Sequence, residues 1–312
     1  MIFAHRRRAL KRALTTTAIA ATLAATAGTA TAADHPTGAE KARAEAVAKL
    51  RATSPLAAPR SAAAGQVQTP TFSMDAVEKT TQELYLYFPD RAGGFDARYD
   101  VGVTYEFATA SISIDNDKDG YSDGSWTIDK SGLLTYTNVH MDPATRDIGT
   151  GWTTYTKVLS PGDLGGTTEA DLMGVDKTGV LWTYVGHSTG LVDARVRIGS
   201  GWDAYTEIAG QSDLSGDGKA DIVARDKAGA LWLYKGTGDI KAPFEPRTKV
   251  GTGWNAYNRL LSVGDLDADG RTDLVARSTT GDLFRYSGTG DAAAPFAKPV
   301  KIGWGYNIYN LL

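Results

Sequence analysis

The chain has 312 residues, 42% of them hydrophobic, no cysteine and a formal net charge of −3. This length is enough for one large all-β domain, and the lack of cysteine excludes a fold held together by disulfides. Residues 71–312 hold 33 acidic against 23 basic residues, and this acidic balance argues against nucleic acid as a partner, because nucleic-acid binding needs a basic surface.

The chain begins with a basic head and an apolar stretch rich in alanine and threonine. Residues 5–12 contain five Lys or Arg residues, and small residues follow at Ala30, Ala32 and Ala33. This pattern is typical of a secretory signal peptide, so we expect residues 1–33 to direct export and the mature chain not to insert into a membrane. The paired arginines in the basic head leave twin-arginine export open beside the general route.

Residues 34–70 have the composition of a pro-segment or linker. Residues 37–50 predict one exposed amphipathic helix, whereas residues 54–70 are rich in Ala, Pro and Ser and too poor in large apolar side chains to bury a core. We therefore expect the folded domain to begin at residue 71. The polar face of the predicted helix would carry Glu40, Lys41, Arg43, Glu45 and Lys49.

Residues 71–312 contain a repeat of about fifty residues. An acidic nine-residue loop begins at Asp115, Asp213 and Asp265, and a degenerate copy begins at Asp163, so the steps are 48, 50 and 52 residues. Around each loop, four short runs of β-branched and aromatic residues are separated by Gly, Asp, Asn and Pro, which is the pattern of strands and turns. Four strands in each unit of this length predict a blade of a β-propeller.

A divergent first unit completes the count. Residues 83–87 match 230–234, and residues 95–102 match 244–251 at Phe, Arg, Val and Gly. The fold class is therefore all-β, a five-bladed β-propeller of four-stranded blades. Its units fall at about 71–114, 115–162, 163–212, 213–264 and 265–312.

The C-terminus of the chain lies where the next acidic loop would begin. If each loop joins the first and second strands of a blade, Tyr306–Leu312 is a first strand without a blade of its own, and the unit at 71–114 lacks a first strand. We expect the C-terminal strand to complete the N-terminal blade and close the ring, which leaves no free edge at the seam.

Each of the three intact loops has the spacing of a calcium site. Carboxylates at positions 1, 3, 5 and 9 and a main-chain carbonyl at position 7 can converge on one ion, and Gly at position 6 permits the sharp turn. Ser at position 3 predicts a weaker second site, and the degenerate loop 163–171 is expected to bind nothing. We expect about three structural Ca²⁺ ions, held by Asp115, Asp117, Asp119, Tyr121, Asp123, Asp213, Ser215, Asp217, Lys219, Asp221, Asp265, Asp267, Asp269, Arg271 and Asp273.

These loops and their period resemble the FG-GAP/VCBS-type repeat family of calcium-binding β-propellers from secreted bacterial proteins. The strongest match is residues 262–275, although Tyr257-Asn258 replaces the Phe-Gly of the family name. Five units of this length are also similar to five-bladed lectin propellers. The resemblance implies that loop calcium is structural and that surfaces of the propeller contact ligand.

Several tryptophans and arginines are candidate ligand-binding residues. Trp152, Trp202 and Trp254 each follow Gly-x-Gly at a strand end, where an indole can stack on a sugar ring, with core packing as the alternative. Arg225 and Arg277 occupy matching places in successive repeats, where they would contact ligand or bridge loops. Trp182 and Trp232 alternate with leucine in a third strand, and we expect them to fill the layer between blades.

Several similar shallow sites around a ring favour binding over catalysis, because repetition supplies avidity. We expect a secreted, non-catalytic propeller that binds carbohydrate or another cell-surface polymer. The Gly-x-Ser-x-Gly sequence at 186–190 aligns with ordinary loops of other repeats, so we do not expect a nucleophile elbow there. The alternatives are a glycan hydrolase or lyase with its active site in the central channel, and a scaffold that binds a protein partner.

Overall fold

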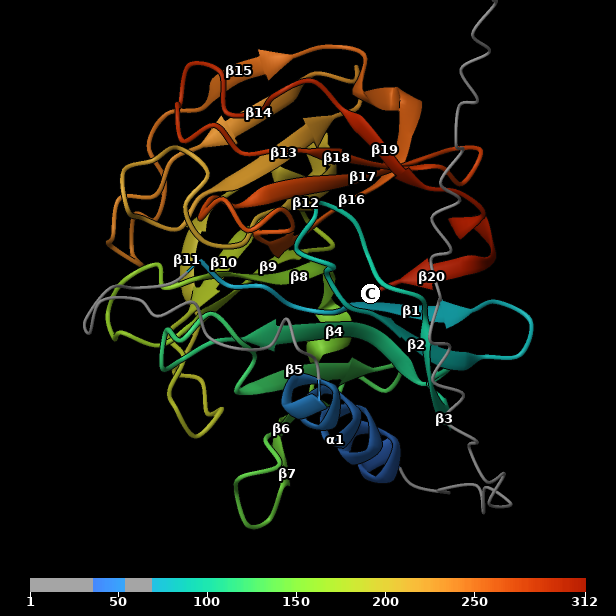
Figure 1. Cartoon of the computed structure of the whole chain (residues 1–312). Helices are drawn as coiled ribbons and strands as arrows, with labels where there is room; N and C mark the ends of the chain where they lie inside the picture. The colour runs from blue at the N-terminus through green and yellow to red at the C-terminus, as the bar shows by residue number, and fades with distance from the viewer. Residues whose placement is uncertain (1–35, 54–68) are drawn as a thin grey trace, which may run out of the picture. The chain divides into compact units, whose positions relative to one another are not determined.

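The computed structural model describes residues 36–53 and 69–312. The signal peptide expected at 1–33 and residues 34–35 and 54–68 of the expected linker lie outside the described residues. The described part consists of one helix, short 3₁₀ turns and twenty strands (Figure 1). Within it, no helix combines the length and the apolar character needed to span a bilayer.

The strands form five antiparallel four-stranded sheets arranged as a ring, which confirms the predicted propeller. Blade 1 is β20 (Tyr309–Leu311), β1 (Met74–Glu78), β2 (Glu83–Tyr87) and β3 (Tyr99–Thr104). Blade 2 is β4 (Ala108–Ile114), β5 (Gly124–Asp129), β6 (Leu134–Thr137) and β7 (Thr145–Gly149). Blade 3 is β8 (Tyr155–Gly162), β9 (Asp171–Asp176), β10 (Leu181–Tyr184) and β11 (Val196–Gly199). Blade 4 is β12 (Tyr205–Ala209), β13 (Ile222–Asp226), β14 (Leu231–Tyr234) and β15 (Thr248–Gly251). Blade 5 is β16 (Tyr257–Gly264), β17 (Asp273–Ser278), β18 (Leu283–Tyr286) and β19 (Val300–Gly303).

The C-terminal strand closes the ring as predicted. Strand β20 pairs antiparallel with β1, with Leu311 opposite Ala76 and Tyr309 opposite Glu78. Because β20 supplies the first strand of blade 1, the two ends of the propeller lie in one sheet, and no first-strand edge is left unpaired at the seam.

Short 3₁₀ turns lead into the first strands of four blades, and each starts after a left-handed glycine. These turns are Trp152–Thr154, Trp202–Ala204, Trp254–Ala256 and Tyr306–Ile308. The glycine before each has φ between 83° and 94°, a conformation that strains any residue with a Cβ atom. The repeated Gly-x-Gly motif therefore fixes where the chain turns back toward the centre of the ring.

The hydrophobic core is divided among the interfaces between neighbouring blades. One cluster fills each of the interfaces 2–3, 3–4, 4–5 and 5–1, as with Trp126 and Leu172 between blades 2 and 3. The second strands are buried on both faces, which explains runs such as Leu274, Val275 and Ala276. The interface 1–2 differs, because its cluster also contains Ala39 and Ala46 from the helix.

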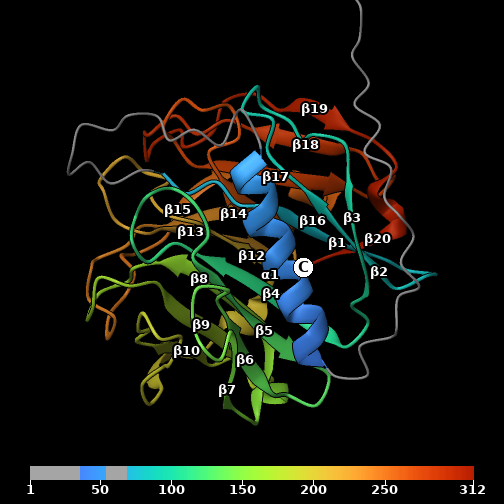
Figure 2. The same ribbon diagram turned by 60° about the horizontal axis from the view of Figure 1, so that its bottom comes forward.

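That helix, α1 (Pro36–Thr53), packs against the propeller instead of standing free in solvent (Figure 2). The prediction of an exposed helix is wrong for its polar face, since Glu40 and Arg43 are each only 2% exposed. Lys41, Glu45 and Lys49 are exposed. The sequence reading failed because the partners of the buried charges lie on strands far along the chain.

Candidate functional site

The acidic loops join the first and second strands of blades 2, 4 and 5, and each gathers carboxylates. In each loop, three carboxylate oxygens lie within 4.8 Å of one another. Oxygen donors alone suit a hard divalent cation such as calcium or magnesium. The three clusters are Asp115, Asp117 and Asp123; Asp213, Asp217 and Asp221; and Asp265, Asp267 and Asp269.

The aspartate at position 1 closes each loop by accepting main-chain N–H groups. Asp115 accepts from Gly120 at 2.9 Å, Asp213 from Gly218 at 2.7 Å, and Asp265 from Gly270 at 2.8 Å. The position-6 glycine has positive φ in all three loops, as the sequence pattern requires. At position 7, each of Tyr121, Lys219 and Arg271 donates its N–H to the carboxylate at position 5.

The ninth-position aspartates of blades 3, 4 and 5 have a second role that the sequence did not reveal. Asp221 accepts the N–H of Gly236 at 2.7 Å, and Asp273 accepts that of Gly288 at 2.9 Å, so each ties its loop to the turn after the third strand. Asp171 of the degenerate loop makes the same bond to Gly186 at 2.8 Å. This bond is present in a loop that gathers no carboxylate cluster, so the ninth aspartate stabilises the blade whether or not a metal binds.

Burial and mutual repulsion make these carboxylates costly to ionise. Desolvation raises the pKa of Asp115, Asp171 and Asp273 to about 7 and that of Asp221 to about 6, against backbone hydrogen bonds that lower it. A bound divalent cation would remove this penalty for Asp115 and Asp221, which belong to clusters. The first and third clusters do not include the predicted ligands Asp119 and Asp273.

Protein cations already pair with several of the predicted ligands. Arg51 of α1 forms an ion pair with Asp119, Lys235 lies 3.7 Å from Asp217, and Arg285 lies 3.2 Å from Asp267. In the second loop, the Ser215 hydroxyl is directed to Asp213 at 3.4 Å. In the degenerate loop, Asp163 pairs with Lys118 at 3.3 Å.

The predicted aromatic platforms are buried, and this prediction is corrected. Trp152, Trp202 and Trp254 are 6–9% exposed. Each indole packs on a tyrosine of the third strand, with ring centroids 4.7–4.9 Å apart. The Gly-x-Gly turn aims the indole into the interface between blades, so no free face is left for a sugar.

Arg225 and Arg277 are also buried, and they join neighbouring blades. Arg225 donates to the main-chain oxygens of Trp254 and Tyr257, and Arg277 donates to those of Tyr306 and Tyr309. Every one of these acceptors lies in the next blade or in the turn that leads to it. Of the two roles expected for these arginines, they therefore have the bridging one, and they are not exposed ligand contacts.

A different repeated constellation lies on blades 1, 3 and 4, with an aromatic ring that is half-buried on blades 3 and 4 and 8% exposed on blade 1. In each, an exposed arginine stacks on a third-strand aromatic ring whose polar hydrogen is donated to a carboxylate. We call these the arginine–aromatic stations: Arg98, Tyr85 and Glu83; Arg195, Trp182 and Asp176; and Arg247, Trp232 and Asp226.

The geometry of the stations is nearly constant. The guanidinium carbon lies 4.0–4.2 Å from the ring centroid, and the ring donates to the carboxylate at 2.8 Å. Each arginine also donates to a tyrosine hydroxyl of the first strand: Tyr309, Tyr155 or Tyr205. Trp182 and Trp232, which we expected to be filler between blades, are therefore half-buried members of an exposed polar and aromatic surface. The match between residues 95–102 and 244–251 aligns Arg98 with Arg247, and this was the sequence signal from which the repeated arginine could have been found.

The Gly-x-Ser-x-Gly sequence lies in the loop between β10 and β11, as expected. His187 Nε2 lies 2.9 Å from Asp193 Oδ1, and Ser188 is exposed on the turn. A nucleophile elbow joins a strand to a helix, whereas this loop joins two strands of one blade.

Residues 213–276 match the family described as FG-GAP-like repeat. This stretch is similar to an FG-GAP-like repeat. It spans the second and third acidic loops and strands β13 to β16, so the resemblance is confirmed where both loops are intact. An FG-GAP-like repeat in a five-bladed propeller indicates a binding or scaffold role.

No curated protein matches the chain. Among solved structures, the chain is similar to Prp20, the RCC1 of Saccharomyces cerevisiae, with 12% identity, coverage of 74% of this chain and 61% of that chain, and a TM-score of 0.37. It is similar to AofleA from Arthrobotrys oligospora, with 11% identity, coverage of 76% and 73%, and a TM-score of 0.43. It is also similar to human WBSCR16, with 10% identity, coverage of 70% and 62%, and a TM-score of 0.32. The chain spans 57% to 61% of the length of Prp20 in two structures.

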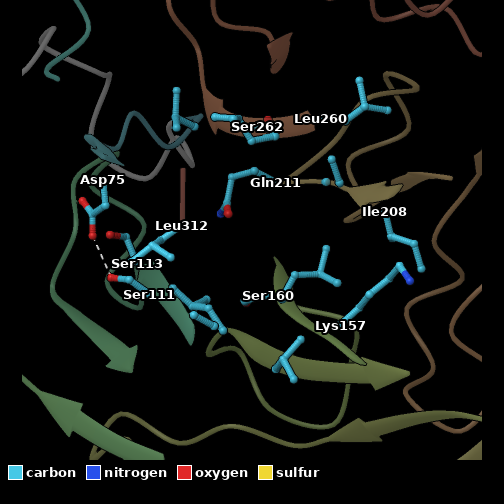
Figure 3. A pocket seen from close by; sticks show the side chains of 18 of the residues that line it. Asp75, Ser111, Ser113, Lys157, Ser160, Ile208, Gln211, Leu260, Ser262 and Leu312 are labelled. Carbon is cyan, nitrogen blue, oxygen red and sulfur yellow. Dashed lines mark hydrogen bonds between the residues drawn. The ribbon is translucent and has the colours of Figure 1, made fainter. Parts of the chain in front are cut away.

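The FG-GAP-like repeat also contributes to a central cavity of about 310 Å³ (Figure 3). First strands β4, β8, β12 and β16 line it, and Gln211, only 6% exposed, points into it. Lys157, Glu207 and Arg259 occupy matching positions on β8, β12 and β16. Glu207 accepts the N–H of Leu260 at 3.1 Å and lies 3.9 Å from Arg259, while burial lowers the pKa of Lys157.

Proposed function

We propose that this protein is an exported, non-catalytic β-propeller, stabilised by calcium, that binds carbohydrate or another cell-surface polymer. The observation that carries the binding proposal is the threefold repetition of the arginine–aromatic station. Each station combines an apolar ring with a cation and a carboxylate, which together suit a ligand that has apolar ring faces and many hydroxyl groups.

Repetition favours a polymer over a small molecule. Stations on three blades of one ring can engage successive units of the same chain, and avidity then exceeds the affinity of any one site. Arg195 and Arg247 are exposed, and hydrogen bonds hold the pKa values of two station carboxylates below the usual range: from Thr178 and Trp182 to Asp176, and from Trp232 to Asp226. The stations on blades 3 and 4 therefore keep both charges over the physiological pH range.

The calcium proposal is supported by the oxygen clusters. Calcium tolerates irregular cages of carboxylate and carbonyl oxygens, whereas magnesium requires a tighter octahedron. Asp115, Asp213 and Asp265 would hold an ion at the start of each loop, and Gly120, Gly218 and Gly270 fix the turn around it. The ion would supply charge neutralisation to a domain with ten more acidic than basic residues.

Export is supported by the basic head and apolar stretch at 1–33. Because an exported chain without cysteine has no disulfides, bound metal would stabilise it in their place. The same acidic balance supports partners other than nucleic acid.

A glycan array read with calcium and with excess chelator tests the proposal. We expect weak, multivalent binding that Trp232→Ala and Trp182→Ala each reduce at least severalfold. Trp304→Ala is the matched control, because Trp304 is 77% exposed and belongs to no station. Equal losses in all three variants would contradict a role for the stations, and an array without signal would favour recognition of a protein partner.

A second candidate, an enzyme acting in the central channel, is favoured by one observation. Lys157, Glu207 and Arg259 place unlike charges at one position of three successive blades, where the repeat would otherwise supply like residues. A glycan hydrolase or lyase of this kind would release reducing or unsaturated ends from a polysaccharide, and Glu207→Gln would abolish that release. Absence of turnover in the wild-type protein would remove this candidate.

A further inference from the structure

The interface between blades 1 and 2 is chemically unlike the others. Strands β4, β5 and β6 turn their apolar residues toward blade 3, where Trp126, Ile128 and Tyr136 are buried in one cluster. Alternate residues of the same strands point the other way, because side chains alternate across a strand. That second face of blade 2 carries hydroxyl groups from Ser111, Ser113, Ser125, Thr127 and Thr135.

The face of blade 1 that meets these hydroxyls is apolar except for Asp75 on β1. Val77, Leu84 and Leu86 are at most 3% exposed, and they share a cluster with Ala39 and Ala46 of α1. Apolar side chains cannot bond to the hydroxyls of blade 2, and Asp75 is a buried charge that needs a cation. Helix α1 meets both needs, because it presents alanines to the apolar part of blade 1 and charged groups to Asp75 and to blade 2.

Arg43 makes the central contact between the helix and both blades. Its Nε donates to Asp75, its Nη1 donates to Ser125 Oγ at 3.0 Å, and its Nη2 donates to Ser113 Oγ at 2.9 Å. Asp75 also accepts from Ser111 Oγ at 2.7 Å (Figure 3). Each nitrogen of the guanidinium therefore has its own acceptor. Such an arrangement is specific for arginine, because the planar guanidinium presents its donors in a fixed geometry.

The short closing strand explains why Asp75 is available to the helix. Strand β20 has three residues, whereas the first strands of the other blades have five to eight. Asp75 on β1 and Ser73 just before it therefore reach the central cavity, which Arg43 also lines. The helix covers this gap in the inner wall, and its Glu40 accepts from Thr135 Oγ1 at 2.6 Å.

We propose that the seam between blades 1 and 2 is a helix-binding groove that recognises an arginine flanked by alanines, and that α1 is its resident, replaceable occupant. Ala39, Arg43 and Ala46 follow the spacing of anchor residues on one face of a helix laid in a groove. Departure of α1 would open the cavity on that side, because Arg43 is part of its lining.

Exchange in trans tests this directly. A protease site inserted between residues 54 and 68 of the full chain would, once cut, leave α1 bound only by its contacts. We would then add fluorescent peptides of residues 36–53 and follow their incorporation by anisotropy and size exclusion. We expect the wild-type peptide to replace α1, and an Arg43→Met peptide to bind on the order of a hundredfold more weakly, because it leaves the buried Asp75 without its cationic partner.

A Lys41→Ala peptide is the matched control, since Lys41 is exposed and pairs only with Glu45. It should bind as the wild-type peptide does. Equal affinity of the Arg43→Met peptide would overturn the arginine recognition. A cut protein that never exchanges its helix, or that unfolds on cutting, would overturn the replaceable occupant, because α1 would then be a permanent part of the ring.

Discussion

Arg277 of blade 5 donates from Nη1 to the main-chain oxygen of Tyr309 at 2.7 Å, so one blade directly holds the strand that closes the next. The same nitrogen donates to Tyr306, and Nε donates to Asn258 at 2.9 Å. Arg225 makes the equivalent bonds one blade earlier. The seam of the ring is therefore secured by the same device that links blades 4 and 5.

Replacing Arg277 with alanine should weaken that seam. Two buried carbonyls would lose a charged donor, and we expect the free energy of unfolding to fall by about 2–4 kcal/mol. Urea unfolding measures the change. Arg197→Ala, at an exposed position on β11, is the control and should shift it by less than about 0.5 kcal/mol. Equal effects would show that Arg277 has no special role at the seam.

Removal of residues 306–312 should abolish cooperative unfolding. The deletion takes away Tyr306, Tyr309 and Leu311 from the cluster between blades 5 and 1, and it leaves β1 with an unpaired edge. Calorimetry should show a broad or missing transition in place of a single sharp one. Asn310→Ala, an exposed change in the same strand, should keep the transition. An unchanged profile in the truncated protein would contradict closure by β20.

The propeller could be predicted because its signals are local. The fifty-residue period, the Gly-rich turns and the buried runs of each second strand are all visible within one repeat, and closure by β20 followed from counting strands. The carboxylate clusters could be predicted for the same reason, since the residues of each cluster lie within one nine-residue loop. The acceptor role of Asp273 was not predicted, because it depends on Gly288 in another turn.

The burial of the tryptophans and the packing of α1 could not be predicted, because both depend on contacts between residues far apart in the sequence. Trp254 and Trp232 both read as aromatic residues at blade strands, yet only the direction of the backbone decided which one is buried and which one lies under Arg247. The helix was misjudged for a similar reason. Arg43 looks like a solvent-exposed charge until β1 brings Asp75, 32 residues later, against it.

The buried pair of Arg43 and Asp75 should behave as a coupled unit. Arg43→Met or Asp75→Ala alone leaves one buried charge unpaired, and each should lower the free energy of unfolding by about 3–5 kcal/mol. The double variant should cost less than the sum of the single ones, which a double-mutant cycle in urea would reveal. Strict additivity of the two losses would mean that the pair makes no mutual contribution.

Glu40 should make stability depend on pH. Burial raises its pKa to about 7, above the ordinary value of 4.5, so the folded state binds a proton that the unfolded state releases. The stability that this group contributes is complete below pH 4.5 and is lost as the pH rises to about 7. Glu40→Gln keeps the acceptor for Thr135 and should therefore stabilise the protein at pH 8 by about 1–3 kcal/mol while changing little at pH 4.

Glu45 supplies the control for that titration. It lies on the exposed face of the same helix, 60% exposed at the side chain, so Glu45→Gln should be nearly neutral at both pH values. If Glu40→Gln gives the same stability difference from wild type at pH 4 and pH 8, the carboxyl does not titrate in the folded protein.

Metal removal should destabilise the ring in proportion to occupied loops. A cation that binds only the folded state adds RT ln(1 + [L]/Kd), about 2.7 kcal/mol for each site at a hundredfold excess over Kd. Excess EDTA should therefore lower the unfolding temperature, and added calcium should restore it. Calorimetric titration should count about three ions, with the second loop weakest because Ser215 offers a hydroxyl in place of a carboxylate.

Two matched variants assign the effect to the loops. Asp265 closes the third loop and belongs to its cluster, so Asp265→Asn should remove one ion from the count and shrink the response to EDTA. Asp163 occupies the same position in the degenerate loop, where it pairs with Lys118, so Asp163→Asn should leave both readings unchanged. An unfolding temperature that does not change when EDTA is added would refute the metal proposal. It would leave the arginine bridges and β20 to hold the ring closed without help, because both act through protein contacts alone.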